Sequence, residues 1–308
     1  MDENVHVSAD TGSDPPYRGT GEGSGPIVTM PTGSRGTHVD DVVAVEVTID
    51  GMLVIADRLH MMEFPPALGI RPNIPQLELR DIVWAQVARD LTDQGVLDFF
   101  GAPHPEVAAM VDTLSRADRT LEGRWWRREL GKMVRFAVCR KGDRHVIAAR
   151  DGDMIVLQRI APQVGLAGMV AAVLGTASPA DVEPLTGVAS QLGQSTTANQ
   201  LAQFGIDPPS ARLYAEITAA PSSWVEITAN ERHPGGTYTQ SEVAAGVLDS
   251  HQGRIVSLPR RVNGELYGSF LPGTTENLQR ALDGLMEFLP SKAWFDKKPL
   301  DFDAHLSD

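Results

Sequence analysis

The sequence of 308 residues contains a single cysteine, Cys139. One thiol cannot form an intramolecular disulfide or a cysteine-based zinc cluster, so both are excluded as sources of stability. The chain has no run of about 18 apolar residues, and its N-terminus lacks the apolar segment of an export signal. We therefore expect a cytoplasmic protein that does not insert into a membrane.

Positive charge is also scarce. Lys and Arg number 27 against 40 Asp and Glu, which gives a formal net charge of −13. Because nucleic-acid binding needs a basic face, this balance argues against DNA or RNA as a partner. The run Arg124-Trp125-Trp126-Arg127-Arg128 has the residue types of a base-stacking surface. It suits a strand better, with tryptophan in the core and arginine on a rim or against an acidic protein.

Recognisable catalytic motifs are missing as well. The sequence contains no G-x-x-x-x-G-K-[ST], H-E-x-x-H or G-x-S-x-G pattern, and its eight histidines are scattered singly. The glycine-rich run Gly19–Gly25 follows no strand and is typical of a linker. Asp151 and Asp153 flank the glycine of a tight turn, which accounts for both carboxylates. We expect no catalytic residue, no metal and no cofactor.

Strand-like patterns gather in two long blocks. Residues 118–162 contain four runs of alternating polarity, and Asp151-Gly152 between two of them predicts a type I′ hairpin. Residues 223–272 repeat this pattern, with turn signals at Pro234-Gly235-Gly236, Gln252-Gly253 and Asn263-Gly264. Each block ends at a proline that precedes a segment of helical period. Two blocks of the same pattern predict two antiparallel meanders in a duplicated unit.

Shorter signals complete each half. Alternation predicts a strand from Val42, and a short strand at Val182–Val188 repeats it in the second half. The strongest predicted helix is Glu78–Gln94, and its apolar stripe consists of Leu79, Ile82, Val83, Val87 and Leu91. Further helices are predicted at Thr196–Phe204 and Pro209–Thr218. Because strand blocks and helix blocks are segregated, we predict an α+β fold with an antiparallel sheet.

Both ends of the chain are predicted to lie outside the folded domain. Seven Gly, four Pro, four Ser and five Thr make up half of residues 1–40, which leaves too little apolar surface to offset the entropy of ordering. We predict a disordered N-terminal tail there and a frayed C-terminal tail at 295–308. The domain then spans 41–294, with an N-terminal half at 42–174 and a C-terminal half at 182–289.

Six long phrases carry a resemblance to a known family: EVTIDGMLVIADRL at 46–59, DRTLEGRWWRR at 118–128, GDRHVIAARDGDM at 142–154, RHPGGT at 232–237, RIVSLPRRV at 254–262 and GELYGSFLPGT at 264–274. With these phrases the chain resembles the EspG family of mycobacterial type VII (ESX) secretion-associated chaperones. The likeness runs from about Val42 to Trp294 and is closest to the member of the ESX-one locus. It implies a pseudo-two-fold duplicated unit with a central antiparallel β-sheet and flanking helical bundles.

The resemblance also implies a function. Members of the family bind the tip of a PE–PPE heterodimer in the cytoplasm, keep it soluble and hand it to the type VII secretion system, without catalysis. Their contact surface comprises the sheet, the loop between the second and third strands, and the C-terminal helical bundle. In this sequence we place the loop at Glu129–Lys132, and the bundle at Thr196–Thr218 together with Thr275–Leu289.

Eight residues are predicted to bind the partner from their positions. Glu129, Leu130 and Lys132 would form a polar rim. The apolar anchors would lie at a helix junction where Gly205 and two prolines interrupt packing: Phe204, Ile206, Leu213, Tyr214 and Ile217. Two other classes of function stay open. One is an enzyme of unknown class whose site is assembled from scattered residues such as His145, Asp151 and Arg127, and the other is a structural dimerisation module.

Overall fold

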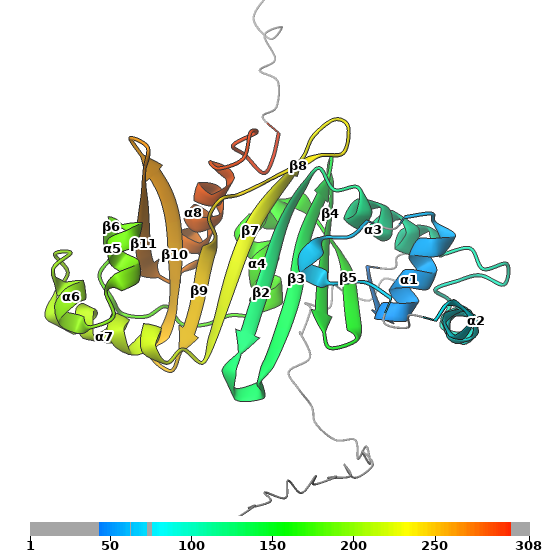
Figure 1. The fold of residues 1–308 in the computed structure, drawn as a ribbon, viewed down its shortest axis with the longest axis horizontal. Helices are drawn as coiled ribbons and strands as arrows, with labels where there is room; N and C mark the ends of the chain where they lie inside the picture. Colours follow the sequence, from blue (N-terminus) through cyan, green and yellow to red (C-terminus); the bar gives the residue numbers. More distant parts are fainter. Residues whose placement is uncertain (1–42, 62, 73–75, 297–308) are drawn as a thin grey trace, which may run out of the picture. The chain divides into compact units, whose positions relative to one another are not determined.

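The strands of both predicted meanders join one antiparallel sheet (Figure 1). In this computed structural model, residues 43–61, 63–72 and 76–296 are described, and all of them belong to one compact unit, Gly36–Asp308. The predicted tail at 1–40 lies outside the described residues, as do residues 297–308. The strands are β1 (Ala44–Thr48), β2 (Arg119–Arg127), β3 (Lys132–Lys141), β4 (Arg144–Asp151), β5 (Met154–Ile160), β6 (Leu185–Val188), β7 (Ser223–Arg232), β8 (Tyr238–Gln240), β9 (Ala245–Ser250), β10 (Gly253–Val262) and β11 (Glu265–Pro272).

The order of the strands confirms the predicted duplication. The sheet runs β1-β5-β4-β3-β2-β7-β9-β10-β11-β6, and β8 pairs with β7 to one side of this path. Outward from the centre, each half therefore presents its four meander strands in sequence and ends with the short strand that preceded the meander. The two halves meet where β2 pairs with β7, in a ladder centred on Gly123 and Ile227. A pseudo-two-fold axis passes through this pair.

Helices surround the sheet on both faces. They are α1 (Ile49–Arg58), α2 (Leu77–Asp93), α3 (Pro105–Ser115), α4 (Gly165–Leu174), α5 (Ala189–Gln194), α6 (Ala198–Ala202), α7 (Pro208–Ala219) and α8 (Thr275–Met286), with single 3₁₀ turns η1 (Pro66–Leu68), η2 (Arg128–Leu130) and η3 (Pro162–Val164). Polar side chains cap several of them: Thr48 accepts from the Gly51 N–H at 3.0 Å, and Asp207 accepts from the Ser210 N–H at 2.7 Å. Pro105 and Pro208 open α3 and α7, where the missing N–H has no helical partner to lose.

The alternation of strand side chains divides the core between the two faces. On one face α4 and α8 pack against residues such as Leu121 and Val256. On the other face two separate bundles cover the outer strands: α1 and α3, with α2 outside them, lie over β3–β5, and α5–α7 lie over β9–β11. Between these two bundles no helix covers β2 and β7 (Figure 1).

This arrangement corrects the predicted C-terminal bundle. The segments Thr196–Thr218 and Thr275–Leu289 lie on opposite faces of the sheet and do not form one bundle. Tyr214 of α7 shares a core with Ile255, whereas Leu282 of α8 shares a core with Val256. Neighbouring residues of a strand point to opposite faces, so α7 and α8 are separated by β10.

The hairpin turns lie where the sequence predicts them, but one of them has a different turn type. Asp151 pairs with Met154, so the central residues of that turn are Gly152 and Asp153, and only Gly152 has a positive φ, 59°. A positive φ at the first central position alone is the signature of type II′, so the predicted type I′ turn is wrong. Asn263 and Gly264 have φ of 50° and 84°, and this turn has the two positive values of type I′.

Helix α2 departs from its predicted burial. Leu79 is 54% exposed and Ile82 is 68% exposed, so these two members of the predicted apolar stripe do not face the core. The helix packs on α1 and does not reach the sheet, so only the side that carries Val87 and Leu91 is covered. No helix in the described residues is both long and apolar enough to cross a bilayer.

The first residues of the predicted C-terminal tail are held in place. Trp294 is buried, and its carbonyl accepts hydrogen bonds from the guanidinium groups of Arg119, at 2.7 Å, and Arg140. The same two arginines pair with Asp296. Fraying is therefore wrong for residues 295 and 296, because two cations on β2 and β3 provide partners that polarity alone does not reveal.

Candidate partner-binding surface

The gap between the two bundles exposes a band of side chains on the two central strands. On β2 and β7, alternate residues point to the face of the bundles and the others contribute to the core under α4 and α8. We call the first set the central stripe: Glu122, Arg124, Trp126, Trp224, Glu226 and Thr228. Its members lie at paired positions, so the stripe is two strands wide along its whole length.

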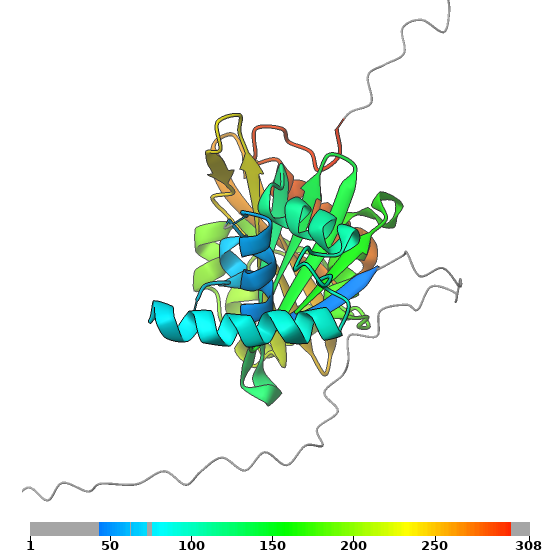
Figure 2. The same cartoon turned by 90° about the vertical axis from the view of Figure 1, so that its right-hand side faces the viewer.

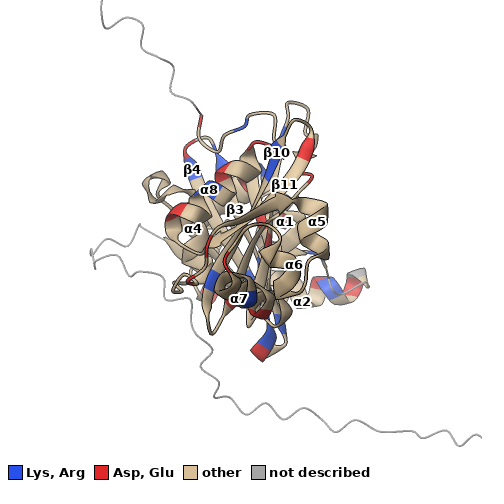
Figure 3. Cartoon of the chain, turned by 90° about the vertical axis from the view of Figure 1, so that its left-hand side faces the viewer, with Lys and Arg blue, Asp and Glu red and all other residues tan. Residues whose placement is uncertain are grey.

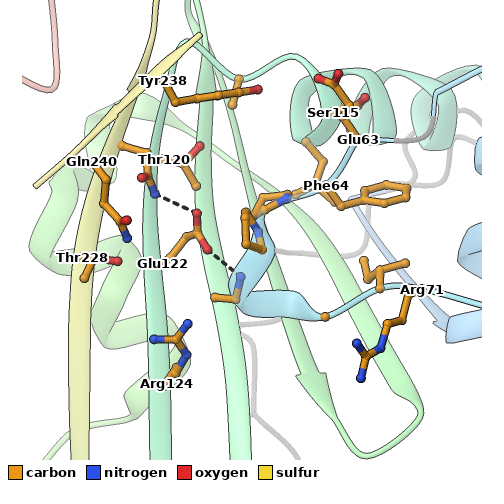
Figure 4. Close-up of a pocket in the computed structure, with 18 of the residues that line it drawn as sticks. Glu63, Phe64, Arg71, Ser115, Thr120, Glu122, Arg124, Thr228, Tyr238 and Gln240 are labelled. Atoms are coloured by element: carbon orange, nitrogen blue, oxygen red, sulfur yellow. Dashed lines mark hydrogen bonds between the residues drawn. The ribbon is translucent and has the colours of Figure 1, made fainter. Parts of the chain in front are cut away.

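One end of the central stripe borders a hollow of about 810 Å³ with a mixed polar and apolar lining (Figure 4). A segment containing η1, residues 63–71, forms the opposite wall, and we call it the strap. Glu122 joins strap to sheet, because its carboxylate accepts from the Ala67 N–H at 2.6 Å and from Asn230 Nδ2 at 2.7 Å. Burial raises the pKa of Glu122, while the Ala67 hydrogen bond and the charge of Arg124 oppose the rise.

A cluster of cations fixes the other end of the strap. Arg150 donates to the carbonyls of Leu68 and Gly69 at 2.7 and 2.8 Å. Burial lowers the pKa of Arg150, and the neighbouring charges of Arg135 and Arg71 lower it further. Gly69 has a φ of 59°, which favours glycine, and an added Cβ would lie 2.6 Å from Arg135 Nη1 and displace that guanidinium.

Two of the cations beside the stripe lack an acidic partner. Among the described residues, neither Arg124 nor Arg135 forms an ion pair within 4.0 Å, although Arg124 faces Glu226 across the ladder. Both side chains are therefore available to a carboxylate on another molecule. An exposed pair of this kind contributes at most about 1 kcal/mol, so these cations would orient a partner more than hold it.

The opposite end of the central stripe is apolar. Trp126 and Trp224 are directly paired across β2 and β7, with ring centroids 5.8 Å apart, and both are partly exposed. Met133 pairs with Trp126 from β3 and is also exposed. Aromatic pairs on a surface, surrounded by polar groups, are typical anchors of protein interfaces.

The loop between β2 and β3 projects beside this apolar end (Figure 1). It consists of η2 and Gly131, whose φ of 57° closes the turn, and the Arg128 N–H donates to the Ser222 carbonyl at 2.9 Å. Leu130 at its tip is 47% exposed. Glu129 and Lys132 are exposed too, and Lys132 lies 3.7 Å from the Asp151 carboxylate. The structure places the β2–β3 connection at residues 128–131, so the predicted loop overlaps it except at Lys132, the first residue of β3, and its role in partner binding stays a prediction.

An uncharged surface lies further out in the C-terminal half, beyond β9 and β10. Residues 184–206, which include β6, α5 and α6, contain no Lys, Arg, Asp or Glu, although such residues make up 22% of the chain. Figure 3 shows α5 and α6 free of charged residues, whereas the neighbouring α7 carries red and blue residues. Covering such a surface requires no desolvation of an ion, which makes it suited to an apolar partner.

The predicted anchors at the helix junction are mostly part of the core. Tyr214 and Ile217 are each 1% exposed, and Ile206 is buried beside them. The Tyr214 hydroxyl lies 2.8 Å from the Glu183 carbonyl and 3.0 Å from the Phe270 carbonyl, so its hydrogen bonds are internal. The expectation that these three side chains are accessible is wrong, because α7 packs directly on the sheet.

The remaining two predicted anchors lie at the margin of that core. Phe204 and Leu213 are partly buried and pack against its periphery. The ring of Phe204 fills the space above Gly187, where an added Cβ would approach it to 2.4 Å. Each of these side chains therefore offers only an edge to a partner.

The residues of the alternative enzyme site are not brought together. His145 and Asp151 lie at opposite ends of β4, roughly 20 Å apart for an extended strand. Arg127 stacks over Trp125, with its guanidinium carbon 5.0 Å from the ring centroid. His145 is buried, and its Nε2 accepts from the Trp294 indole N–H at 3.1 Å. These contacts give each residue a structural role.

Comparison with known proteins identifies the family. A sequence model of the EspG family matches residues 48–284. The chain belongs to the EspG family. ESX-1 secretion-associated protein EspG1 of Mycobacterium marinum (strain ATCC BAA-535 / M) is 72% identical over 275 residues, which cover 89% of this chain and 97% of that protein. EspG1 of Mycobacterium tuberculosis (strain ATCC 25618 / H37Rv) is 72% identical over 265 residues, covering 86% and 93%.

More distant members share the fold. ESX-3 secretion-associated protein EspG3 of Mycolicibacterium smegmatis (strain ATCC 700084 / mc(2)155) is 30% identical over 273 residues, covering 84% of this chain and 92% of that protein. The solved structure of the Mycobacterium tuberculosis type VII secretion system chaperone EspG5, in complex with a PE25-PPE41 dimer, superposes with a TM-score of 0.67. It is 18% identical and covers 83% of this chain and 100% of that chain.

Two features of this EspG surface escaped the sequence reading. The uncharged run at 184–206 was visible in the sequence and could have been found by scanning for charge. The pairing of Trp126 with Trp224 could not, because it depends on the register between strands nearly 100 residues apart. Only the structure brings both features to one side of the molecule.

Proposed function

We propose that this EspG protein is a cytoplasmic, non-enzymatic chaperone that binds the tip of a PE–PPE heterodimer and hands it to the type VII secretion system. Its relatives are named ESX secretion-associated proteins, and the solved EspG5 is a chaperone in complex with a PE25-PPE41 dimer. A helical substrate with an apolar tip is prone to aggregate, and a strongly acidic chaperone lends it solubility.

The observation that carries the proposal is the apolar end of the central stripe. Trp126 and Trp224, both partly exposed, and the exposed Met133 form an apolar surface beside the β2–β3 loop, and the uncharged segment 184–206 lies further out beyond β9 and β10. We propose the two tryptophans as the anchors. Leu130, Glu129 and Lys132 form the rim, and the exposed edges of Phe204 and Leu213 widen it. The unpaired cations Arg124 and Arg135 favour a partner whose apolar tip carries carboxylates nearby.

Co-expression with a PE–PPE heterodimer followed by titration calorimetry tests the proposal. Trp224→Ala should weaken binding by about 2 kcal/mol or more, a factor of roughly 30, because a central aromatic anchor is lost. Leu130→Asp should also weaken binding, since it places a charge at the contact. Lys132→Ala on the rim should cost about 1 kcal/mol or less.

The controls separate loss of binding from loss of fold. Thermal melts by circular dichroism identify variants that unfold, and Val164→Asp serves as a matched control, because Val164 is an exposed apolar residue on η3, away from the stripe. Absence of any stable complex with several PE–PPE pairs would refute the chaperone role. If the well-folded Trp224→Ala and Leu130→Asp proteins bind like the wild type, the function stands and the surface is wrong.

A further inference from the structure

The connection between α2 and α3 contains a tight turn that carries two aromatic side chains into solvent. Phe99 is 90% exposed and Phe100 is 91% exposed, and their rings meet edge to face with centroids 5.6 Å apart. Figure 1 shows this connection at the outer end of the N-terminal half, far from β2 and β7. Figure 2 looks onto the same end, where α2 lies across the outside of the bundle. We call residues 98–101 the aromatic turn, and it lies outside the proposed partner-binding surface.

The aromatic turn is held rigidly by its own hydrogen bonds. The Asp98 carbonyl accepts from the Gly101 N–H at 2.9 Å, and the Asp98 N–H donates to the Ala102 carbonyl at 2.8 Å. One carboxylate oxygen of Asp98 accepts from the N–H groups of Phe100 and Ala102 at 2.9 and 2.8 Å. Gly101 has a φ of 81°, so the four residues form a type I turn closed by a glycine bulge. The two rings therefore project from a fixed backbone.

The fold does not require phenylalanine at either position. The two central positions of a type I turn accept most residue types, and neither ring is buried against another part of the described chain. The base of the turn is anchored by Leu97, which is buried, and by the His104 N–H, which donates to the Val96 carbonyl at 2.9 Å. Polar side chains at the tip would keep these contacts and avoid the hydration cost of two exposed rings. The aromatic pair therefore points to a binding partner outside the described residues.

A free cation lies beside the aromatic turn. A Cβ added to Gly101 would lie 3.9 Å from the Nε and Cζ atoms of Arg58, so this guanidinium is next to the turn. Arg58 is exposed, and among the described residues it forms no ion pair within 4.0 Å. A protein surface fits this arrangement if it has an apolar pocket for the two rings and a carboxylate at the rim of the pocket. A lipid bilayer fits less well, because anionic headgroups repel a chain with a net charge of −13.

We propose that the aromatic turn docks the loaded chaperone onto a membrane component of the type VII secretion system. Phe99 and Phe100 enter an apolar pocket of that component, and Arg58 pairs with a carboxylate at the rim. The inference rests on the proposed function, since a protein that hands over a bound substrate needs a second surface that stays open while the first is occupied. Rigid aromatic anchors lose little conformational entropy on binding, so a small contact is sufficient for a transient docking step.

Membrane vesicles test the inference. The probe is a preparation of inside-out vesicles from cells that carry the cognate type VII system, and reference vesicles come from cells that lack it. The fluorescently labelled complex of the chaperone with a PE–PPE heterodimer should bind saturably to the first preparation and not to the second. Phe99→Ser/Phe100→Ser should weaken this binding at least about thirtyfold, because both anchors are lost. Arg58→Glu should weaken it about tenfold, because it places like charges at the rim.

Control measurements separate docking from substrate binding and from folding. Titration calorimetry should give the Phe99→Ser/Phe100→Ser protein the affinity of the wild type for the PE–PPE heterodimer, because the aromatic turn is remote from the central stripe. Val43→Ser/Val164→Ser replaces two other exposed apolar residues and should dock like the wild type. Circular dichroism melts check that each variant is folded, as expected for substitutions of exposed side chains.

The outcomes distinguish this inference from the proposed function. A double variant at Phe99 and Phe100 that docks like the wild type, or a wild type that binds neither preparation, would overturn the inference and leave the chaperone role intact. Equal binding to vesicles that lack the system, or to protein-free vesicles of the extracted lipids, would assign the turn to a lipid surface and also overturn it. Absence of a PE–PPE complex in calorimetry would refute the proposed function itself, and the docking role with it.

Discussion

The side chain of His145 should make the fold sensitive to mild acid. His145 is buried, with Nε2 accepting from the Trp294 indole N–H at 3.1 Å and Nδ1 lying 3.2 Å from the Asp143 carbonyl oxygen. An indole N–H can only donate, so Nε2 has to remain unprotonated while this hydrogen bond exists. Burial lowers the pKa of His145 below its ordinary 6.5, and the charge of Arg140 lowers it further, against the carboxylates of Asp118 and Asp143.

The size of the effect follows from proton linkage. In the unfolded chain the imidazole takes up its proton near pH 6.5, whereas in the folded chain it does so only at a lower pH. The stability that neutral His145 contributes is therefore complete above pH 6.5 and is lost as the pH falls towards the pKa of the folded state. Between about pH 7.5 and about pH 5.5 the loss can reach about 1.4 kcal/mol and no more.

The variant His145→Gln isolates this contribution. The Gln carbonyl oxygen can accept from the Trp294 N–H but cannot be protonated, so at pH 7.5 the free energy of unfolding should fall by only about 1 kcal/mol. As the pH falls, the difference in free energy of unfolding between wild type and variant should shrink, because only the wild type loses the stability that neutral His145 contributes. Urea unfolding of both proteins across the pH range measures it, and all other titrating groups cancel in the difference. Parallel pH profiles would refute the reasoning.

Two substitutions on β2 test how the central strand is packed. Gly123→Ala would place a Cβ 2.1 Å from the buried ring of Phe136 and should lower the free energy of unfolding by about 2–3 kcal/mol. The second substitution Phe136→Leu in the same chain should recover a part of this loss. An unchanged urea midpoint for Gly123→Ala would contradict the contact. Glu122→Ala removes the acceptor of the Ala67 N–H and the Asn230 amide and should cost about 2 kcal/mol, whereas Glu122→Gln, which keeps one acceptor, should cost less by the same assay.

Local patterns predicted most of the strands because these strands have an apolar face along at least part of their length. Val225 and Ile227 on β7, and Val134 and Phe136 on β3, alternate with residues that face the bundles. The duplication was readable for the same reason, since both meanders repeat the alternation and end at a proline. Patterns of this kind specify which residues share a face, but they contain no information on which helix covers that face.

The residues whose exposure was predicted wrongly all depend on a packing partner that lies far away in the sequence. Leu79 and Ile82 are exposed because α2 packs on α1 and not on the sheet, which the period of α2 cannot show. Tyr214 is a core residue because its ring and hydroxyl meet Phe270 on β11. Asp296 is held by its ion pair with Arg140, and the ring of Phe295 packs against His145. For the proposed partner-binding surface, the sequence patterns indicated the β2–β3 loop but not the pairing of Trp126 with Trp224.

The pseudo-two-fold axis shows why only one end of the central stripe suits an apolar partner. The axis at Gly123 and Ile227 relates Trp126 to Asn230 and Trp224 to Thr120, so the backbone offers two equivalent ends. The side chains make these ends different: one carries both tryptophans and the projecting β2–β3 loop, and the other carries the buried carboxylate of Glu122, which is bonded to the strap and lines a hollow of mixed polarity. Replacement of Trp224 alone therefore leaves the symmetric backbone intact and removes one of the two tryptophans that distinguish this end from the other. We expect such a protein to keep its fold and lose its partner, an outcome that a purely structural role for the tryptophan pair would not produce.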